Sequence, residues 1–152
     1  MDIFRYFEDF RDSEIIDLGT KIVTADEIIA FASEFDPQPF HLDEEAGRAS
    51  ILGGLAASGW HTAAMMMRLL CEAFLLNSAS MGSPGISSLK WKKPVLAGDK
   101  LSAQAEVLSC RRSRSKPEMG IVEFRFTVSN QNGDAVLIQE NPILFKVREV
   151  AA

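Results

Sequence analysis

The hydrophobic pattern of this chain changes its period once, near residue 82, and this change restricts the folds open to it. Upstream, residues 57–76 carry apolar side chains at helical spacing. Downstream, apolar and polar residues alternate over 101–107 and 122–128, which is typical of strands with one buried face. A long apolar helix followed by one-sided antiparallel strands predicts an α+β architecture, in which a curled sheet wraps around one central helix.

One face of this predicted helix is expected to lie against the sheet. Its apolar members recur at intervals of three and four: Trp60, Ala63, Ala64, Met67, Leu70, Cys71 and Phe74. The opposite face, expected to be the polar one, contains His61, Met65, Arg68 and Glu72. We interpret His61 as a residue of that polar face rather than as a catalyst.

Two capping patterns place two shorter helices in the first third of the chain. Thr24 and Glu27 have the spacing of a capping box, so a helix is expected to end near residue 35. Asp43 is expected to cap a short helix that ends near residue 49.

Prolines and glycines mark the loops. Pro37 and Pro39 lack backbone N–H groups, so residues 36–40 are expected to form a stiff loop. Gly133 supplies the positive φ of a hairpin turn. The last strand, over residues 135–147, is expected to be broken by a bulge at Pro142.

Length and composition indicate one globular domain over residues 1–152. The chain is 47% hydrophobic and 24% charged, values typical of a protein with a single well-filled core. Its net charge of −5 argues against a general affinity for nucleic acids or anionic membranes. Residues 49–67 are uncharged, but glycine, serine and histidine interrupt them too often for a membrane span.

The few cysteines and histidines exclude several classes of site. Cys71 and Cys110 have no C-x-x-C spacing, and we expect both to be free thiols in a reducing compartment. His41 and His61 are the only histidines and lie in no metal-ligand cluster, so no metal site is expected. Residues 1–5 lack the basic start of a leader peptide, which favours a cytoplasmic protein.

The densest group of reactive side chains lies on the proline segment. Asp36 and His41 are five positions apart, and a carboxylate and an imidazole form a workable acid–base pair near neutral pH. The two prolines restrict the segment, so both groups can be held in a fixed relation at low entropic cost. The alternative is that Asp36 caps a turn and His41 is a packed core residue.

The start of the long helix is a second candidate site. The first amides of a helix have no internal partners, and the helix dipole is positive there. We expect Ser58 and Gly59 to form an oxyanion or substrate-binding site, in which the missing side chain of Gly59 leaves room for a ligand oxygen. The alternative is an ordinary helix start with Ser58 as N-cap.

Basic residues form a third candidate, for the phosphates of a large substrate. They cluster in two places: Lys90, Lys92 and Lys93, and then Arg111, Arg112, Arg114 and Lys116. A solvated strand face and a solvated loop explain them equally well, and we favour that interpretation.

Two segments resemble a known enzyme family. The stretch from Phe31 to Asp43 resembles the hydratase motif of MaoC-like dehydratases and (R)-specific enoyl-CoA hydratases, whose pattern is roughly F-A-x-x-S-G-D-x-N-P-x-H-x-D. Residues 93–101 are similar to the family's K-P-V-x-x-G-D-x-L turn. The motif's Ser-Gly is Glu34-Phe35 here and its asparagine is Gln38, while the aspartate and histidine are kept.

The resemblance implies the hot-dog fold and the reversible addition of water to a trans-2-enoyl thioester. It assigns Asp36 and His41 as the catalytic pair, and it assigns the Gly59 N–H to the thioester oxygen. It also implies an acyl-CoA or acyl-carrier substrate, no separate cofactor because CoA would be part of the substrate, and a homodimer or a higher homo-oligomer.

Two rival functions stay open at this point. A hot-dog thioesterase usually has a carboxylate on or just before the central helix, whereas residues 49–67 contain neither Asp nor Glu. A non-catalytic acyl-thioester-binding module is the other, and the change to Glu34-Phe35 keeps it open.

Overall fold

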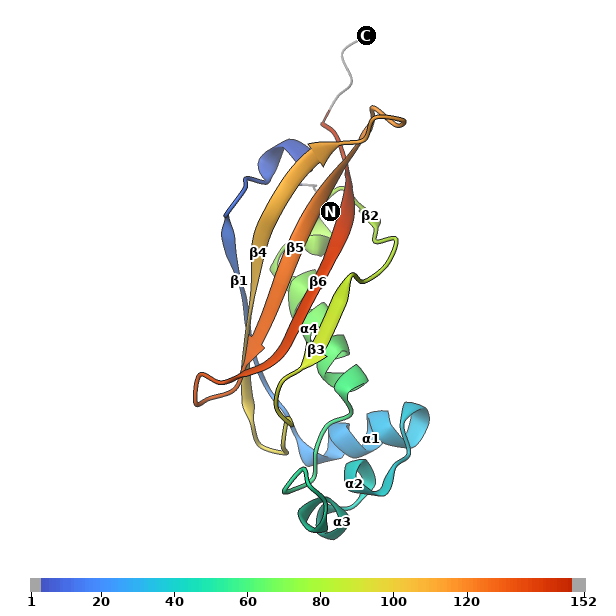
Figure 1. Ribbon diagram of the computed structural model, residues 1–152, viewed down its shortest axis with the longest axis vertical. Helices are drawn as coiled ribbons and strands as arrows, with labels where there is room; N and C mark the ends of the chain where they lie inside the picture. The colour runs from blue at the N-terminus through green and yellow to red at the C-terminus, as the bar shows by residue number, and fades with distance from the viewer. Residues whose placement is uncertain (1–3, 149–152) are drawn as a thin grey trace.

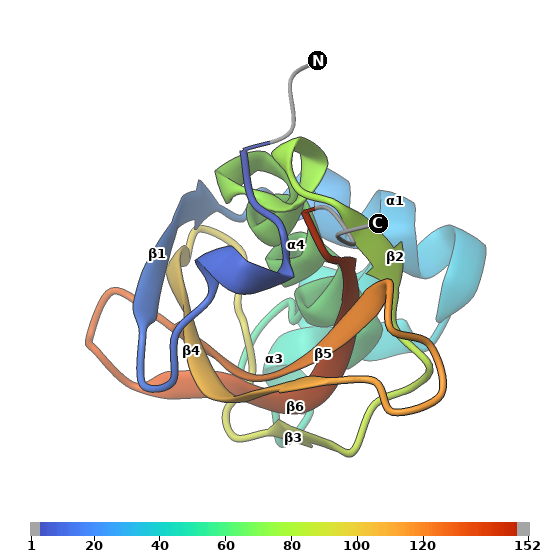
Figure 2. The same ribbon diagram turned by 90° about the horizontal axis from the view of Figure 1, so that it is seen from above.

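One antiparallel sheet curves around a single long helix (Figures 1 and 2). The computed structural model describes residues 4–148, so the first three residues of the segment searched for a leader lie outside it. The six strands are β1 (Ile15–Ile22), β2 (Ser80–Gly82), β3 (Ser88–Trp91), β4 (Lys100–Arg112), β5 (Met119–Ser129) and β6 (Ala135–Lys146). Their order is β1-β4-β5-β6-β2, and β3 also pairs with β6.

The helices fall into two groups (Figure 1). The central helix is α4 (Gly59–Ala73), whereas three shorter helices gather at one end of the sheet: α1 (Ala25–Phe35), α2 (Pro39–Leu42) and α3 (Glu44–Ala49). Two 3-10 turns complete the set, η1 (Phe7–Asp9) and η2 (Leu75–Asn77). Among residues 4–148, no helix is long and apolar enough to cross a membrane.

The core lies between the concave face of the sheet and α4. Inward positions of β4, β5 and β6 alternate with outward ones, and Phe124, Phe126 and Phe145 are completely buried. They share one core cluster with Met66 and Leu70 of α4. The α+β architecture with a curled sheet around one helix, the hot-dog arrangement that the resemblance implied, is therefore confirmed.

Several local predictions are also confirmed. The Thr24 hydroxyl accepts a hydrogen bond from the Glu27 N–H, and the Glu27 carboxylate accepts one from the Thr24 N–H at 2.8 Å, as a capping box requires. Asp43 caps α3 by accepting a 2.9 Å hydrogen bond from the Ala46 N–H. Gly133 has a φ of 80° in the hairpin turn, and both cysteines are free thiols.

The expected faces of α4 are only partly right: Leu70 is buried and Arg68 is exposed as expected, but other members are reversed. Trp60 is 58% exposed and Met67 is 44% exposed, whereas His61 and Met65, assigned to the polar face, are only 6% and 5% exposed. The helix is also shorter than residues 57–76. Because α4 is apolar around most of its circumference, its own pattern does not fix which side meets the sheet. The contacts with the phenylalanines of the sheet decide this instead.

The proline segment is helical where a loop was expected. Pro39 is the first residue of α2, so Phe40 and His41 lie on a short helix and not on a loop. A proline is tolerated at this position because the first N–H groups of a helix have no internal acceptor. Only residues 36–38 keep the expected non-helical conformation.

The last strand is continuous where a bulge was expected. The register between β5 and β6 runs without interruption through the pair Glu123–Pro142. On its other side β6 pairs with β3 up to Glu140 and with β2 from Leu144, so Pro142 lies where the neighbouring edge is interrupted and no N–H is needed. Strands β1 and β2 were not predicted.

Candidate active site

Asp36 and His41 come together at the end of the sheet where the short helices gather. Asp36 follows the last turn of α1, and its N–H donates to the Ala32 carbonyl. Its Oδ2 lies 3.4 Å from Nε2 of His41, while its Oδ1 accepts a 2.6 Å hydrogen bond from the Gln38 side chain. The five-residue spacing therefore brings the carboxylate and the imidazole face to face, across the turn made by the two prolines.

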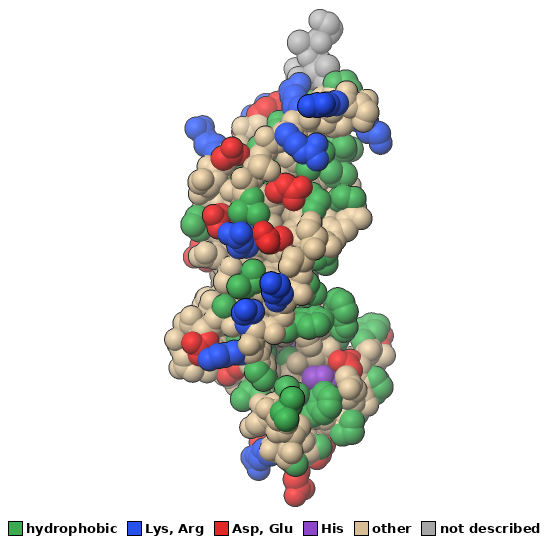
Figure 3. All heavy atoms as spheres, viewed as in Figure 1, with side chains coloured by type: hydrophobic (Ala, Val, Ile, Leu, Met, Phe, Trp, Pro, Cys, Tyr) green, Lys and Arg blue, Asp and Glu red, His purple; other side chains and the backbone are tan. Residues whose placement is uncertain are grey.

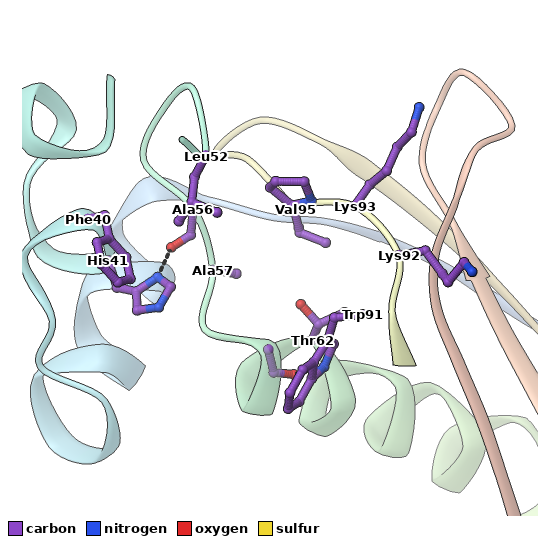
Figure 4. A pocket seen from close by; sticks show the side chains of 12 residues that line it. Phe40, His41, Leu52, Ala56, Ala57, Thr62, Trp91, Lys92, Lys93 and Val95 are labelled. Atoms are coloured by element: carbon purple, nitrogen blue, oxygen red, sulfur yellow. Dashed lines mark hydrogen bonds between the residues drawn. The ribbon is translucent and has the colours of Figure 1, made fainter. Parts of the chain in front are cut away.

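A backbone carbonyl fixes the orientation of the His41 ring. Nδ1 lies 2.6 Å from the carbonyl oxygen of Ala56, which can only accept, so Nδ1 carries a proton (Figure 4). The ring packs edge-on against Phe40, with 4.6 Å between ring centroids, and the residue is 6% exposed. In the neutral ring, Nε2 then directs a lone pair toward the Asp36 carboxylate.

Asp36 is held in its ionised form. Partial burial raises its pKa, but the nearby Ser58 hydroxyl, the hydrogen bond from Gln38 and the positive charge that His41 carries when its ring is protonated outweigh burial and lower the pKa below its ordinary value. The Ser58 hydroxyl is fully buried beside this carboxylate, although its geometry falls short of a regular hydrogen bond to any group among residues 4–148. Ser58 occupies the N-cap position of α4 without capping the helix through its side chain.

A short extended segment connects this pair with the start of α4. The Ala56 N–H donates to the Phe40 carbonyl of α2 at 3.3 Å, and the Ala57 N–H donates to the Val95 carbonyl at 2.8 Å. The Leu55 carbonyl accepts from Ala97 at 3.0 Å. The segment thus lies between α2 and residues 95–97, and it continues directly into Gly59.

Trp91 covers the first turn of α4. Its indole Nε1–H donates a 2.9 Å hydrogen bond to the Gly59 carbonyl, and its ring occupies the space that a Cβ on Gly59 would need. The glycine is therefore required by the tryptophan, a reason different from the room for a ligand oxygen that we expected. The Trp91 ring also meets Trp60 edge to face, with 5.1 Å between ring centroids.

These elements enclose a cavity of about 300 Å³ between α2, the start of α4 and the segment after β3 (Figure 4). His41, Gly59, Thr62, Trp91 and Val95 line it, whereas Asp36 and Ser58 do not. In Figure 3, hydrophobic side chains gather at the narrow waist between the sheet and the helical end. The cavity therefore has His41 on one side and the tryptophan and the helix start on the other.

The remaining candidates take different positions. Lys92 and Lys93 line the cavity, and Lys93 pairs with Asp134 at 2.9 Å. His61 does not line it; its ring stacks on Phe31 at 4.7 Å, and burial lowers its pKa. Within residues 4–148, no group of three or more His, Cys, Asp or Glu side chains has a geometry that could hold a metal ion.

Sequence reasoning missed Thr62, Trp91 and the Ala56 carbonyl. Trp91 belongs to a strand and meets α4 only after the sheet has formed, so no local pattern announces the contact. A carbonyl carries no sequence signal at all. Thr62 could have been predicted as a lining residue. It lies about one turn after the predicted helix start, and small polar residues at that position face the same side as the first N–H groups of the helix.

Comparisons with known proteins agree with this architecture. Residues 16–128 match the family model of the MaoC-like domain. The MaoC-like dehydratase from Rhodospirillum rubrum is 42% identical, with a TM-score of 0.89 over 97% of this chain and 100% of that one. The (R)-hydratase from A. caviae involved in PHA biosynthesis is 26% identical, with a TM-score of 0.73 over 92% of this chain and 98% of that one.

A curated relative matches at similar length. The uncharacterized protein YdeM of Bacillus subtilis (strain 168) is 30% identical over 139 residues, which cover 91% of this chain and 97% of that protein. The family model alone spans well over half of the chain. The chain therefore belongs to the MaoC-like domain family, which includes hydratases and dehydratases.

Proposed function

We propose that the protein adds water to a trans-2-enoyl thioester, or removes it from the 3-hydroxyacyl product, with Asp36 and His41 as the catalytic pair. The observation that carries the proposal is the 3.4 Å approach of Asp36 Oδ2 to Nε2 of a buried histidine that lines a cavity of about 300 Å³. The (R)-hydratase name of one structural neighbour supports the same chemistry.

The geometry suits activation of a water molecule. Because the Nδ1 proton of His41 is engaged by Ala56, the neutral ring presents an acceptor at Nε2, and the ionised Asp36 presents a second acceptor beside it. A water molecule that donates to both is oriented and made more nucleophilic. Its oxygen bonds to C3 of the substrate, and the proton taken from it returns to C2 through the same pair.

The start of α4 would stabilise the enolate that forms in this reaction. Gly59 lines the cavity and is the first residue of the helix, so its N–H has no partner within the helix. Placed against the thioester oxygen, this N–H and the helix dipole would favour the negative charge that develops there. Loss of one such donor typically lowers turnover by about 10²–10³-fold.

The test measures hydration of crotonyl-CoA as the loss of enoyl-thioester absorbance. Asp36→Asn and His41→Ala are each expected to lower kcat by about 10²–10⁴-fold, the usual contribution of a positioned acid–base group. Glu34→Gln is the matched control, because it removes an exposed carboxylate from the same helix end and should leave kcat unchanged. Undiminished hydration by Asp36→Asn would overturn the assignment, and release of free thiol without hydration would favour a thioesterase.

We propose CoA as the carrier of the acyl group. Lys92 lines the cavity and, within residues 4–148, forms no ion pair, so its ammonium group is available for a phosphate. Lys92→Gln is expected to raise KM for crotonyl-CoA several-fold and to leave KM for the N-acetylcysteamine thioester unchanged, since that analogue has no phosphate. An equal effect on both thioesters would refute phosphate recognition by Lys92.

We also propose that two copies of the chain associate. Large apolar side chains are exposed along α4 and the neighbouring edge of the sheet: Trp60, Met67, Met81, Ile86 and Trp91. Trp60 and Trp91 of this group are in direct contact, and monomeric proteins rarely leave large apolar patches in water. Light scattering should give the mass of a dimer or a multiple of it, and Met67→Glu should shift the mass toward the monomer. A monomeric wild-type protein would contradict the proposal.

A further inference from the structure

A second cavity, of about 130 Å³, lies between α4 and the inner face of the sheet. Met67 and Leu70 of α4 form one wall, and Phe126 and Ile143 of the sheet form another. Two carboxamide side chains of β6, Gln139 and Asn141, also line it, and the rest of the lining is Leu75, Ser80, Gly82 and Ser83. None of the lining side chains is charged. The cavity is therefore uncharged, and its polar side chains are the two amides and two serines.

The two carboxamides occupy positions where the sheet is otherwise apolar. Inward residues of β6 on both sides of them, Leu137 and Ile143, belong to the core, yet Gln139 and Asn141 are only 7% and 5% exposed. The Gln139 Nε2 donates a 2.9 Å hydrogen bond to Asn141 Oδ1. A buried amide destabilises the fold unless its polar groups are satisfied, so two at successive inward positions need an explanation.

Their mutual hydrogen bond does not satisfy every polar atom of the two amides. Among residues 4–148, the Gln139 Oε1 accepts no hydrogen bond, and the Asn141 Nδ2 reaches only the carbonyl of the next residue, Pro142, at 3.1 Å. An acceptor and a donor thus border the cavity. A ligand group that donates and accepts, such as a hydroxyl, matches both.

The second cavity lies in line with the first. On β3 and β6, Trp91 of the first cavity pairs with Leu137, and Leu89 pairs with Gln139 two residues further on, about 7 Å along the strand. On α4, Thr62 of the first cavity and Met67 of the second are five residues apart, about 7.5 Å along the helix. Both cavities therefore follow the same seam between α4 and β6.

We infer that the second cavity binds the far end of the substrate's acyl chain, and that this end carries an uncharged polar group, a hydroxyl or a carbonyl. The inference rests on the proposed function, because the chain must extend from a thioester held in the first cavity. A carboxylate is disfavoured, since no cation lines the cavity to compensate its burial. A plain alkyl end would offer no hydrogen to the Gln139 Oε1, which accepts no hydrogen bond within residues 4–148.

The test compares matched pairs of trans-2-enoyl-CoAs of increasing chain length, one ending in a methyl group and the other in a hydroxyl group. At the length that reaches the amides, kcat/KM for the hydroxyl substrate should exceed that for the methyl substrate by about tenfold, the effect of one good hydrogen bond. Gln139→Leu should abolish or reverse this ratio and leave hydration of crotonyl-CoA, whose chain is too short, unchanged.

Two further variants separate polarity from packing. Asn141→Leu should lower the ratio in the same way as Gln139→Leu. Ile143→Val enlarges the same cavity without changing its polarity, so it should affect both members of a pair alike. If either leucine variant fails to fold, the wild-type ratio still decides.

The results that would overturn the inference differ from the result that would overturn the proposed function. A wild-type protein that hydrates crotonyl-CoA but shows a ratio near one at every chain length would overturn the inference and leave the hydratase intact. A ratio that survives both leucine variants would also overturn it. A protein that hydrates no enoyl thioester would refute the proposed function, and the inference with it.

Discussion

Replacing Gly59 with alanine tests whether the glycine is required by Trp91. Gly59 does not have a positive φ, so alanine meets no backbone strain there. Its Cβ would, however, overlap the Trp91 indole, and it would break the 2.9 Å hydrogen bond from the indole to the Gly59 carbonyl. The predicted loss of stability therefore arises entirely from the contact between α4 and β3.

The expected magnitude follows from three contributions. Overpacking typically costs about 1–3 kcal/mol, in this case toward the lower end because the indole is 46% exposed and can partly move aside. The lost hydrogen bond adds about 0.5–1.5 kcal/mol. Alanine regains up to about 1 kcal/mol over glycine in a helix, and less at its first residue. We expect Gly59→Ala to lower the free energy of unfolding by about 1–2 kcal/mol.

A double-mutant cycle isolates the contact. Urea unfolding followed by circular dichroism, at one protein concentration, is measured for the wild type, Gly59→Ala, Trp91→Ala and the double variant. In the Trp91→Ala background the alanine should be neutral or slightly stabilising, because nothing remains for its Cβ to meet. An equal loss of stability in both backgrounds would refute the reasoning.

The cycle also addresses the oxyanion role. If the double variant regains stability but does not regain hydratase activity relative to Trp91→Ala alone, the added methyl group blocks the ligand oxygen as well. If its activity returns together with its stability, the glycine serves only the tryptophan.

Three further predictions concern stability and reactivity. The pKa of Asp36 is lower in the folded protein than in the unfolded chain. The ionised carboxylate therefore stabilises the fold at a pH above the pKa of the unfolded chain, and this stabilisation is lost as the pH falls through the pKa of the folded protein. Urea unfolding between neutral and acidic pH should show this loss of stability in the wild type and not in Asp36→Asn. Thr24→Ala removes the acceptor for the Glu27 N–H and should lower the free energy of unfolding by about 1 kcal/mol, with a Thr24→Ser variant close to wild type in the same assay. Burial, helped by Asp12, raises the pKa of Cys110 to about 11, so iodoacetamide should label Cys110 much more slowly in the native protein than in urea when followed by peptide mass spectrometry; equal rates would contradict its burial.

The parts of the fold that the sequence predicted are those with a regular local pattern. β4 and β5 have one wet and one dry face, so their alternation survives directly in the sequence. β1 was missed because its apolar residues do not alternate with polar ones along the sequence: Ile15 and Ile16 are adjacent, and Ile15 and Ile22 are 60% and 63% exposed at the edge of the sheet. The buried face of α4 was predicted only in part, because its burial is decided by the sheet and not by its own sequence.

The candidate site likewise has a part that local sequence predicts and a part that it does not. The approach of Asp36 to His41 follows from two prolines and a spacing of five residues, all of which are local. The contact between Trp91 and Gly59 joins residues 32 positions apart, and the pairing of β3 with β6 must form before it exists. Prediction therefore succeeded for the proximity of Asp36 and His41 and failed for the walls of the cavity.

The part of the site built from local sequence and the part carried by the sheet can change independently of each other. The Nδ1 of His41 is bound by the Ala56 carbonyl, only three residues before Gly59, so the imidazole and the first helical amide are held together by a short stretch of backbone. Trp91 and Gln139, in contrast, are carried by the sheet. Under the proposed function, substitutions on β3 and β6 can therefore change the size and polarity of the space offered to an acyl chain without moving Asp36 and His41 relative to α4. On this argument, changes in substrate preference should map to the sheet, and changes in kcat that are common to all substrates should map to residues 36–59.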